Sequence, residues 1–469
     1  MAETLDLPDL QGLIARGYGA LAGACYILLT IDERAAACRW LQGLAERITP
    51  GDARPQELAL NVAFTSSGLR KLGLAQAALA MFSYEFRTGM TTDHRRRILG
   101  DTDEIAPEMW TWGGPNTPGI DLVLLLFARD DAKLDLLYRT MQAGFADAGV
   151  TEIQRLATSN IGDSEHFGFR DSVSQPIVEG LSKTGPPAHT IKAGEFILGY
   201  LNEYGLYTDR PLLAPGADPA GLLPKDPAGS GSADLGRNGS YLVMRQLSQD
   251  VRAFWQWIDR ATSNADGSAN PAARLRLASK MVGRWPSGAP LVQAPDRDNP
   301  SLAEANDFMY FQSDAQGLAC PIGAHVRRAN PRDSLDPQPG SQDSIAINKR
   351  HRLLRRGREY GPRLTMDEAL SDRDTPGAER GLHFICLNGN IARQFEFIQH
   401  TWINNPKFDG LYDAADPLVA GREQNTFTVQ ARPVRERYCS LPRFVAVRGG
   451  AYFFLPGICA LRYLASLNG

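Results

Sequence analysis

The chain has 469 residues, with 50 lysines and arginines against 53 aspartates and glutamates, so its formal net charge is −3. Hydrophobic residues make up 43% of the sequence and charged residues 22%, which is typical of globular proteins. A net charge this close to zero gives no reason to expect nucleic acid or an anionic membrane as a partner. The length allows two or three domains.

The cysteines and the N-terminus indicate a compartment. No two of the six cysteines stand in the Cys-x-x-Cys spacing of a zinc or haem-c site, and several lie in apolar runs. We therefore expect reduced, buried thiols. The N-terminus is acidic and lacks a signal-peptide pattern, and no apolar run approaches the roughly 20 residues of a membrane helix. A cytoplasmic protein without a membrane segment is expected.

Strand and helix patterns alternate in the N-terminal part. The predicted elements are strands at 24–31, 58–64 and 121–127, helices at 32–48 and 130–148, and a short helix that opens at 66–69. Asp32 is the predicted N-cap of the first helix. Two strand–helix–strand units with an antiparallel return predict a ferredoxin-like α+β sandwich.

The later part repeats this pattern after two loop-like stretches. Residues 211–237 are rich in Pro, Gly, Ala and Asp and predict a surface insertion, whereas 329–348 predict a loop that either covers a ligand route or has no such role. A strand is expected at 382–387 and a helix at 390–402, so the chain shows a weak internal duplication.

Residues 320–332 (CPIGAHVRRANPR) are the most informative stretch of the sequence. They place His325 after a Cys-Pro-x-Gly bend and just before Arg327 and Arg328. A neutral imidazole can bind iron through one ring nitrogen while an acceptor holds the other. Guanidinium groups suit the carboxylates of a large anionic ligand such as haem. Taken alone, the pattern is also that of a histidine in a basic surface loop.

Further motifs follow in a fixed order and remove this ambiguity. They are HFGFRDSVSQP at 166–176, GEFILGY at 194–200, NGSYLVMR at 238–245, RRGREYG at 355–361 and GLHF at 381–384. Together with the histidine segment, this chain resembles the dye-decolorizing peroxidases, a family of haem enzymes. The likeness extends from about residue 11 to the C-terminus.

The resemblance implies an α+β fold of two ferredoxin-like halves, each an antiparallel sheet with packed helices. One haem b per chain would be held mainly by the C-terminal half. We expect the halves at 1–180 and 311–469, with a connecting segment at 181–310 that includes the insertion near 211–237. The segment 194–200 would match a mid-chain strand of the family, and 238–245 the strand after its insertion.

The family motifs also assign roles on the two faces of the haem. His325 would be the proximal iron ligand, with Asp416 bonded to its other ring nitrogen and Asp413 as the reserve choice. On the open face, Asp171 would move a proton of hydrogen peroxide and Arg355 would stabilise the departing oxygen. A carboxylate base, with a reference pKa of about 3.9, would keep the enzyme active in acid.

Five more residues would contact the haem. Leu382 and Phe384 match the apolar lining of the open face, and as alternate strand residues they point the same way. His166, Arg327 and Arg328 are candidates for contacts to the haem carboxylates.

One position departs from the family. Its motif ends in glycine where this chain has Ser172. Serine there indicates either an ordinary backbone angle or a strain on the order of 1 kcal/mol. Because Asp171 is retained, the change concerns the shape of the loop and the access of peroxide more than the chemistry.

The resemblance implies a peroxidase that uses hydrogen peroxide to oxidise dyes, phenols and similar aromatic reductants. The alternatives are a haem-binding or haem-delivery protein with incidental peroxidase activity, and a non-haem interaction protein with decayed motifs. The family oxidises large dyes partly at surface Trp or Tyr, but the sequence does not choose among its seven Trp and fourteen Tyr. Trp402 has the spacing of a core residue. The oligomeric state stays open.

Overall fold

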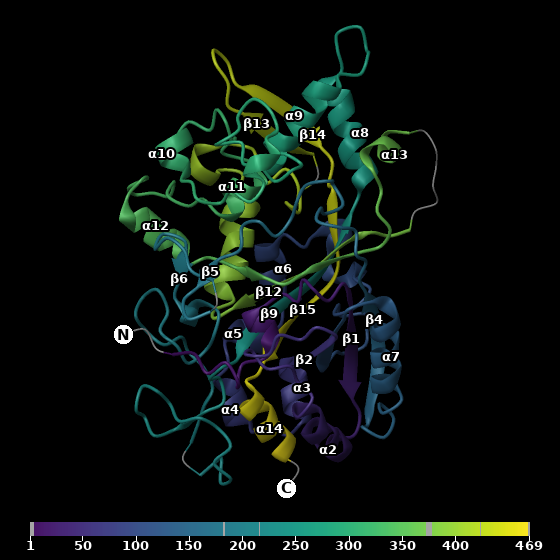
Figure 1. Cartoon of the computed structure of the whole chain (residues 1–469), viewed down its shortest axis with the longest axis vertical. Coiled ribbons are helices and arrows are strands. Elements are labelled where there is room, and N and C mark those ends of the chain that lie inside the picture. The colour runs from purple at the N-terminus through teal and green to yellow at the C-terminus, as the bar shows by residue number, and fades with distance from the viewer. Residues whose placement is uncertain (1–3, 182, 215, 372–377, 423, 468–469) are drawn as a thin grey trace.

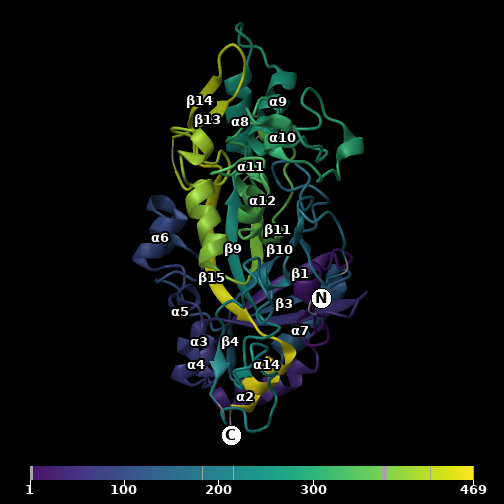
Figure 2. The same cartoon turned by 90° about the vertical axis from the view of Figure 1, so that its left-hand side faces the viewer.

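One antiparallel sheet of nine strands runs through the molecule, which is described by a computed structural model at residues 4–181, 183–214, 216–371, 378–422 and 424–467 (Figures 1 and 2). In spatial order its strands are β10 (Leu354–Arg355), β12 (Gly381–Asn388), β9 (Ser240–Gln249), β15 (Val445–Leu455), β2 (Leu58–Phe64), β3 (Leu122–Ala128), β1 (Gly23–Ile31) and β4 (Val150–Ala157), with β11 (Arg358–Tyr360) paired to β12.

Strands β1, β2 and β3 of the N-terminal half are largely apolar on both faces, because helices cover one face and a loop layer covers the other. Cys25, Ile27 and Leu29 of β1 face the core beneath the helices, and the alternate residues face a second core that includes the N-terminal segment. The covering helices are α2 (Arg34–Ala45), α3 (Ser66–Lys71), α7 (Asp131–Gln142) and α14 (Ile458–Ser466). This is the predicted ferredoxin-like layering, although Glu33 rather than Asp32 caps α2.

The second half of the sheet is built from β9, β12 and β15, with the short β10 and β11 at its edge. Strand β9 comes from the segment predicted as a connection, so the two halves interleave along the chain. Strand β15 joins the two halves by pairing with β2, where Phe454 lies opposite Phe64. Across β9 and β12, Leu247 lies opposite Leu382 and Arg245 opposite Phe384. These four side chains share one face of the sheet.

A helical layer stands over that face at the end of the molecule away from α2 and α14 (Figure 1). It contains α8 (Val251–Thr262), α9 (Pro271–Val282), α11 (His325–Ala329), α12 (Gln342–Lys349), α13 (Met366–Leu370) and the hairpin of β13 (Asn425–Val429) with β14 (Glu436–Leu441). The helix expected at 390–402 is present as two π-helical segments, Ala392–Glu396 and Ile398–Ile403. Trp402 is buried there, as predicted.

Short elements fill the remaining chain. They are α1 (Gly12–Ala15), α4 (Gln76–Ala80), α5 (Tyr84–Thr88), α6 (Asp93–Leu99), α10 (Tyr310–Asp314), and the two-residue strands β5 (Ile177–Val178), β6 (Thr190–Ile191), β7 (Leu212–Leu213) and β8 (Ala233–Asp234). The strand expected at 194–200 is wrong: a 3-10 turn at Ala193–Glu195 begins that segment and turns follow it. Within the 329–348 stretch, the predicted loop gives way to α12 from Gln342 onward.

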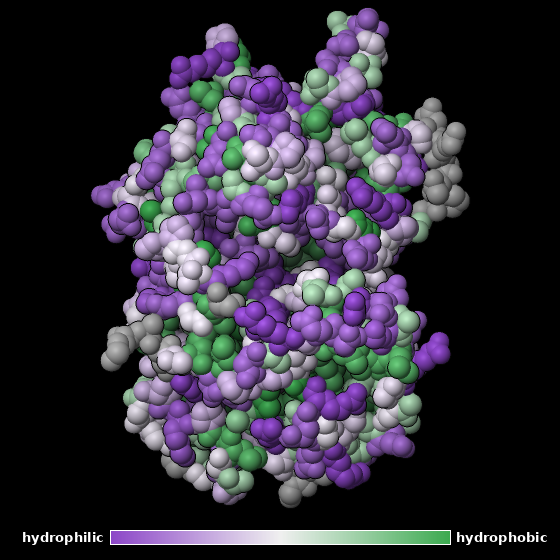
Figure 3. All heavy atoms as spheres, in the orientation of Figure 1, coloured by the Kyte–Doolittle hydropathy of each residue, from purple (hydrophilic) through white to green (hydrophobic). Residues whose placement is uncertain are grey.

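Surface properties follow the expectations only in part. Figure 3 shows a largely hydrophilic face whose apolar residues gather towards the half that carries α2 and α14. Four of the six free cysteines are buried as predicted, but Cys439 is exposed and Cys459 is partly exposed. Among the described residues, no helix is long and apolar enough to cross a membrane.

Gly381 lets β12 lie close to β9, and replacing it tests how far the stability of the sheet depends on this contact. A Cβ atom added at Gly381 would lie 1.9 Å from the carbonyl oxygen of Leu247. We expect Gly381→Ala to lower the free energy of unfolding by about 2–3 kcal/mol. Gly43, in α2, has no neighbour within 4 Å of such an atom, so Gly43→Ala should instead stabilise by about 1 kcal/mol. Chemical denaturation measures both, and equal effects would contradict the assignment.

Candidate functional site

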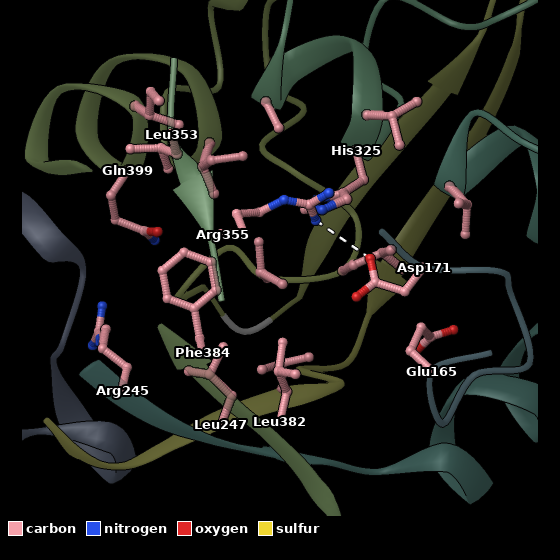
Figure 4. A pocket seen from close by; sticks show the side chains of 18 of the residues that line it. Glu165, Asp171, Arg245, Leu247, His325, Leu353, Arg355, Leu382, Phe384 and Gln399 are labelled. Atoms are coloured by element: carbon pink, nitrogen blue, oxygen red, sulfur yellow. Dashed lines mark hydrogen bonds and ion pairs between the residues drawn. The ribbon is translucent and has the colours of Figure 1, made fainter. Parts of the chain in front are cut away.

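A cavity of about 300 Å³ lies between the sheet and the helical layer (Figure 4). Side chains of β9, β12 and β15 form its floor, and α11 and the π-helical segments form its roof. Its volume is at the lower end of the range of about 300–1,000 Å³ for pockets that take small molecules and cofactors.

His325 enters the cavity from the start of α11, and a buried carboxylate fixes its ring. Its Nδ1 lies 3.0 Å from Oδ2 of Asp416, while Oδ1 of Asp416 accepts the backbone N–H groups of Leu418 and Val419. The His325 side chain is 31% exposed and lines the cavity, and its Nε2 has no hydrogen-bond partner in the described part of the chain. The structure therefore pairs His325 with Asp416, whereas Asp413 pairs with Arg437.

The electrostatics of this pair favour a strongly polarised imidazole. Burial acts to lower the pKa of His325, but the adjacent Asp416 carboxylate outweighs it and the net pKa is raised. Burial acts to raise the pKa of Asp416, but His325 and the Arg328 guanidinium reverse the effect and the net pKa is lowered. Asp416 is thus an anion that accepts the Nδ1 proton, which leaves Nε2 as the ligand atom.

Asp171 and Arg355 meet in the same cavity. The Arg355 Nη1 lies 3.4 Å from Oδ1 of Asp171, and each side chain is 34% exposed into the cavity. Strand β10 carries Arg355, whose backbone N–H donates to the side chain of Gln175. Figure 4 shows the Arg355 side chain reaching across the cavity towards Asp171 and His325. A base and a cation therefore face the same space as the candidate ligand.

Leu382 and Phe384 line the floor beside this pair, as the sequence predicts. Their register with β9 sets Leu247 and Arg245 next to them on the same face. Arg245 is buried and forms an ion pair with buried Asp101, which the sequence reasoning missed.

The structure does not bring His166, Arg327 or Arg328 to the cavity. The ring of His166 is buried, with Nε2 2.9 Å from the carbonyl oxygen of Tyr360. Arg327 donates to the carbonyl groups of Asp314 and Cys320, and Arg328 to four carbonyl groups. On α11, Arg327 lies about 200° round the helix from His325, whereas Arg328, three residues on, is held by the carbonyl groups that surround its guanidinium. Their expected contacts to haem carboxylates find no support in the geometry.

Two other arginines line the cavity in their place. Arg352 is 6% exposed, and its guanidinium has no hydrogen bond or ion pair within the described ranges. Arg284 donates to carbonyl and amide oxygens, but no described carboxylate pairs with it. Burial lowers the pKa of Arg352 to about 9 and that of Arg284 to about 10. Arg352 stands three residues before Arg355, just ahead of the 355–361 motif, and this position was the signal that could have identified it.

Glu165 is a further cavity residue that the sequence reasoning missed. It lies six residues before Asp171, and its carboxylate accepts the backbone N–H groups of Phe167 and Phe169. Burial raises the pKa of Glu165 to about 7, although these hydrogen bonds act in the opposite direction. The signal that could have identified it was an acid directly before the 166–176 motif that supplies Asp171.

The residues present fit a haem group. Nε2 of His325 faces the cavity without a protein partner, and the walls beside it include Leu382, Phe384 and other apolar side chains. An unpaired buried guanidinium is unfavourable unless an anion approaches it. Two cations without carboxylate partners, Arg352 and Arg284, match the two carboxylates of haem in charge.

Comparison with known proteins agrees with this geometry. No protein-family model matches the chain. Peroxidase 2 of Mycetinis scorodonius is 30% identical over an alignment that covers 99% of this chain and 88% of that protein. The multifunctional dye peroxidase DyP2 of an Amycolatopsis species is also 30% identical, over 93% of this chain and 91% of that protein. The chain belongs to the dye-decolorizing peroxidase family.

Solved dye-decolorizing peroxidases share the fold. One from Auricularia auricula-judae has a TM-score of 0.80 and 25% identity, covering 98% of this chain and all of that one. Another, in complex with 2,6-dimethoxyphenol, has a TM-score of 0.78 and 26% identity, covering 99% of this chain and 100% of that one. The expected α+β fold of two ferredoxin-like halves is therefore confirmed.

Ser172 takes the backbone conformation that glycine is favoured to supply, with φ of 63°. Because this is the left-handed region, serine bears a strain of about 1 kcal/mol, but the path of the loop is the one expected for glycine. We expect Ser172→Gly to change the free energy of unfolding by no more than about 1 kcal/mol, since relief of strain is offset by a more flexible unfolded chain.

The same substitution should leave the rate of reaction with hydrogen peroxide within about threefold of wild type, because the backbone that carries Asp171 does not need to move. Thermal unfolding and stopped-flow mixing measure the two effects. A rate change beyond tenfold would show that the serine side chain itself controls the access of peroxide.

Proposed function

We propose that this chain is a haem peroxidase that binds one haem b and uses hydrogen peroxide to oxidise dyes, phenols and similar aromatic reductants. The observation that carries the proposal is that one cavity is lined both by His325, whose ring Asp416 holds, and by the Asp171–Arg355 pair. A haem-delivery protein has no use for a base and a cation held together over the open face, so the alternative is not favoured.

The first task of the chain is to hold the cofactor. Haem, when bound, would supply the iron and porphyrin from which the two electrons that break the O–O bond of peroxide come. His325 is the proposed ligand through Nε2, and Asp416 keeps the ring in the required tautomer and makes it a stronger donor. Arg352 and Arg284 are proposed to bind the carboxylates of haem.

Asp171 is proposed to move the proton that peroxide cleavage requires. As a carboxylate it would take a proton from one peroxide oxygen and return it to the other, which leaves as water. Arg355 donates hydrogen bonds where negative charge develops on that departing oxygen. The apolar side chains of Leu382 and Phe384 keep bulk water from this step. Reductants then restore the two electrons one at a time.

Removal of the proposed base or cation tests this mechanism. Asp171→Asn and Arg355→Leu should each slow the reaction with hydrogen peroxide by about 10²–10⁴-fold, because general acid–base catalysis and charge stabilisation are lost. Haem should stay bound, since neither residue is a proposed ligand. Asp413→Asn is the control, because Asp413 pairs with Arg437 away from His325.

Stopped-flow mixing and the porphyrin absorbance band report on these variants separately. A protein that binds haem but keeps its wild-type peroxide rate in both variants would rule out the proposed roles. A purified chain without a porphyrin band after growth with iron would rule out the haem peroxidase itself.

The assignment of Arg352 makes a separate prediction. Arg352→Leu should weaken haem binding by the apo-protein about 10–100-fold, because a charge-assisted hydrogen bond of about 1.5–3 kcal/mol is lost. Arg350→Leu is the matched control, since its guanidinium lies 4.1 Å from the centre of the Tyr204 ring. In a titration with haem dimethyl ester, which lacks the carboxylates, wild type and Arg352→Leu should bind alike. Unchanged haem affinity in Arg352→Leu would refute the assignment.

A further inference from the structure

Asp171 lies at the end of a narrow hairpin, so its position depends on how that hairpin is closed. The backbone N–H of Asp171 donates to the carbonyl oxygen of Asp163 at 3.1 Å, and Ser164 pairs with Arg170. At the tip, the N–H of Gly168 donates to the carbonyl oxygen of Glu165, and Gly168 has φ of 95°. A change in the shape of this tip therefore moves the base at its end.

The carboxyl group of Glu165 closes the hairpin from inside. One oxygen accepts the N–H of Phe169 at 3.1 Å, and the other accepts the N–H of Phe167 at 2.8 Å. The second oxygen also accepts Nε2 of Gln249 on β9 at 2.9 Å, so the group ties the hairpin to the floor of the cavity. Glu165 thus accepts three hydrogen bonds, two from backbone N–H groups of the loop and one from the Gln249 side chain on β9.

Aromatic packing also holds the same hairpin. The ring centre of Phe167 lies 4.4 Å from that of Phe254, and the ring of Phe169 stacks on Trp255 at 6.4 Å. Both partners belong to α8. These rings pack the tip against the helix, whereas Glu165 accepts a hydrogen bond from Gln249 on a strand of the cavity floor.

Glu165 also shares its surroundings with charged groups of the site. Burial raises its pKa to about 7, the two amides and Gln249 act to lower it, and the Asp171 carboxylate on the same loop acts to raise it. On α11, His325 interacts electrostatically with the same carboxyl group. Figure 4 shows Glu165 and Asp171 on the same side of the cavity. Removing the carboxyl group leaves three donors without an acceptor, which favours a rearranged loop.

We propose that Glu165 is a positioning residue for Asp171: it closes the hairpin at residues 163–171 and thereby sets the separation between Asp171 and Arg355. This inference rests on the proposed peroxidase function. It assigns no proton transfer to Glu165, whose oxygens are occupied by donors of the loop and of β9.

The test measures the reaction of the haem-loaded full chain with hydrogen peroxide in Glu165→Ala and Glu165→Gln, each alone and combined with Asp171→Asn. Glu165→Ala should slow this reaction about 10–100-fold, as expected for a misplaced catalytic group, with the porphyrin band and the KM for the reductant unchanged. Glu165→Gln keeps one acceptor oxygen and the shape of the side chain, so it should recover part of the rate.

The double variant separates positioning from general damage. If Glu165 acts through Asp171, Glu165→Ala should slow the Asp171→Asn enzyme less than about twofold, because the two effects are then not additive. Glu304→Gln is the control, because Glu304 is 73% exposed and pairs with Arg170 of the same hairpin. It should keep the wild-type rate.

Each outcome decides one question. A wild-type rate in Glu165→Ala, with Asp171→Asn slow, overturns the inference alone. Equal slowing by Glu165→Ala with and without Asp171 overturns it too, since the residue then acts by another route. A wild-type rate in Asp171→Asn instead overturns the proposed function. If Glu165→Ala does not fold, the same comparison with the isosteric Glu165→Gln carries the decision.

Discussion

The site depends on one constraint, the burial of several arginine side chains. A buried guanidinium stays favourable only where acceptors or anions surround it. Arg245 on the floor of the cavity meets this condition through Asp101, and Arg327 and Arg328 meet it through backbone carbonyl groups. Arg352 does not meet it within the described residues, which leaves an electrostatic place for an anionic cofactor. The positive charge of Arg352 is thus available to an anionic cofactor that binds in the cavity.

The pleat of the sheet shapes the floor of that cavity. Because side chains alternate along β9 and β12, the face that packs under helices in the N-terminal half continues as the cavity floor in the other half. A slip of one residue in this register would send Phe384 and Leu382 to the opposite core. The helical layer then needs to supply only a ligand, His325, and a loop needs to supply only a base, Asp171.

Much of this arrangement could be predicted from sequence, because periodic patterns and ordered motifs report local structure. The strand at 58–64 agrees with the structure, and so does the choice of Asp416 over Asp413 as the partner of His325. The failures concern direction. Arg327 and Arg328, next to His325 in sequence, donate to backbone carbonyl groups instead of lining the cavity, and the apolar run at 194–200 packs as turns because burial does not require a strand. The contacts of Glu165 join a loop to a distant strand, which periodicity does not report.

The interleaving of the two halves has a consequence for folding. Strand β9, at the centre of the cavity floor, pairs with β15, which lies far from it along the chain. The floor is therefore incomplete until both strands are in place, and contacts this distant in sequence form slowly. Arg245 on β9 accordingly stays exposed to solvent until late in folding, and a cofactor has no complete floor to bind before that step.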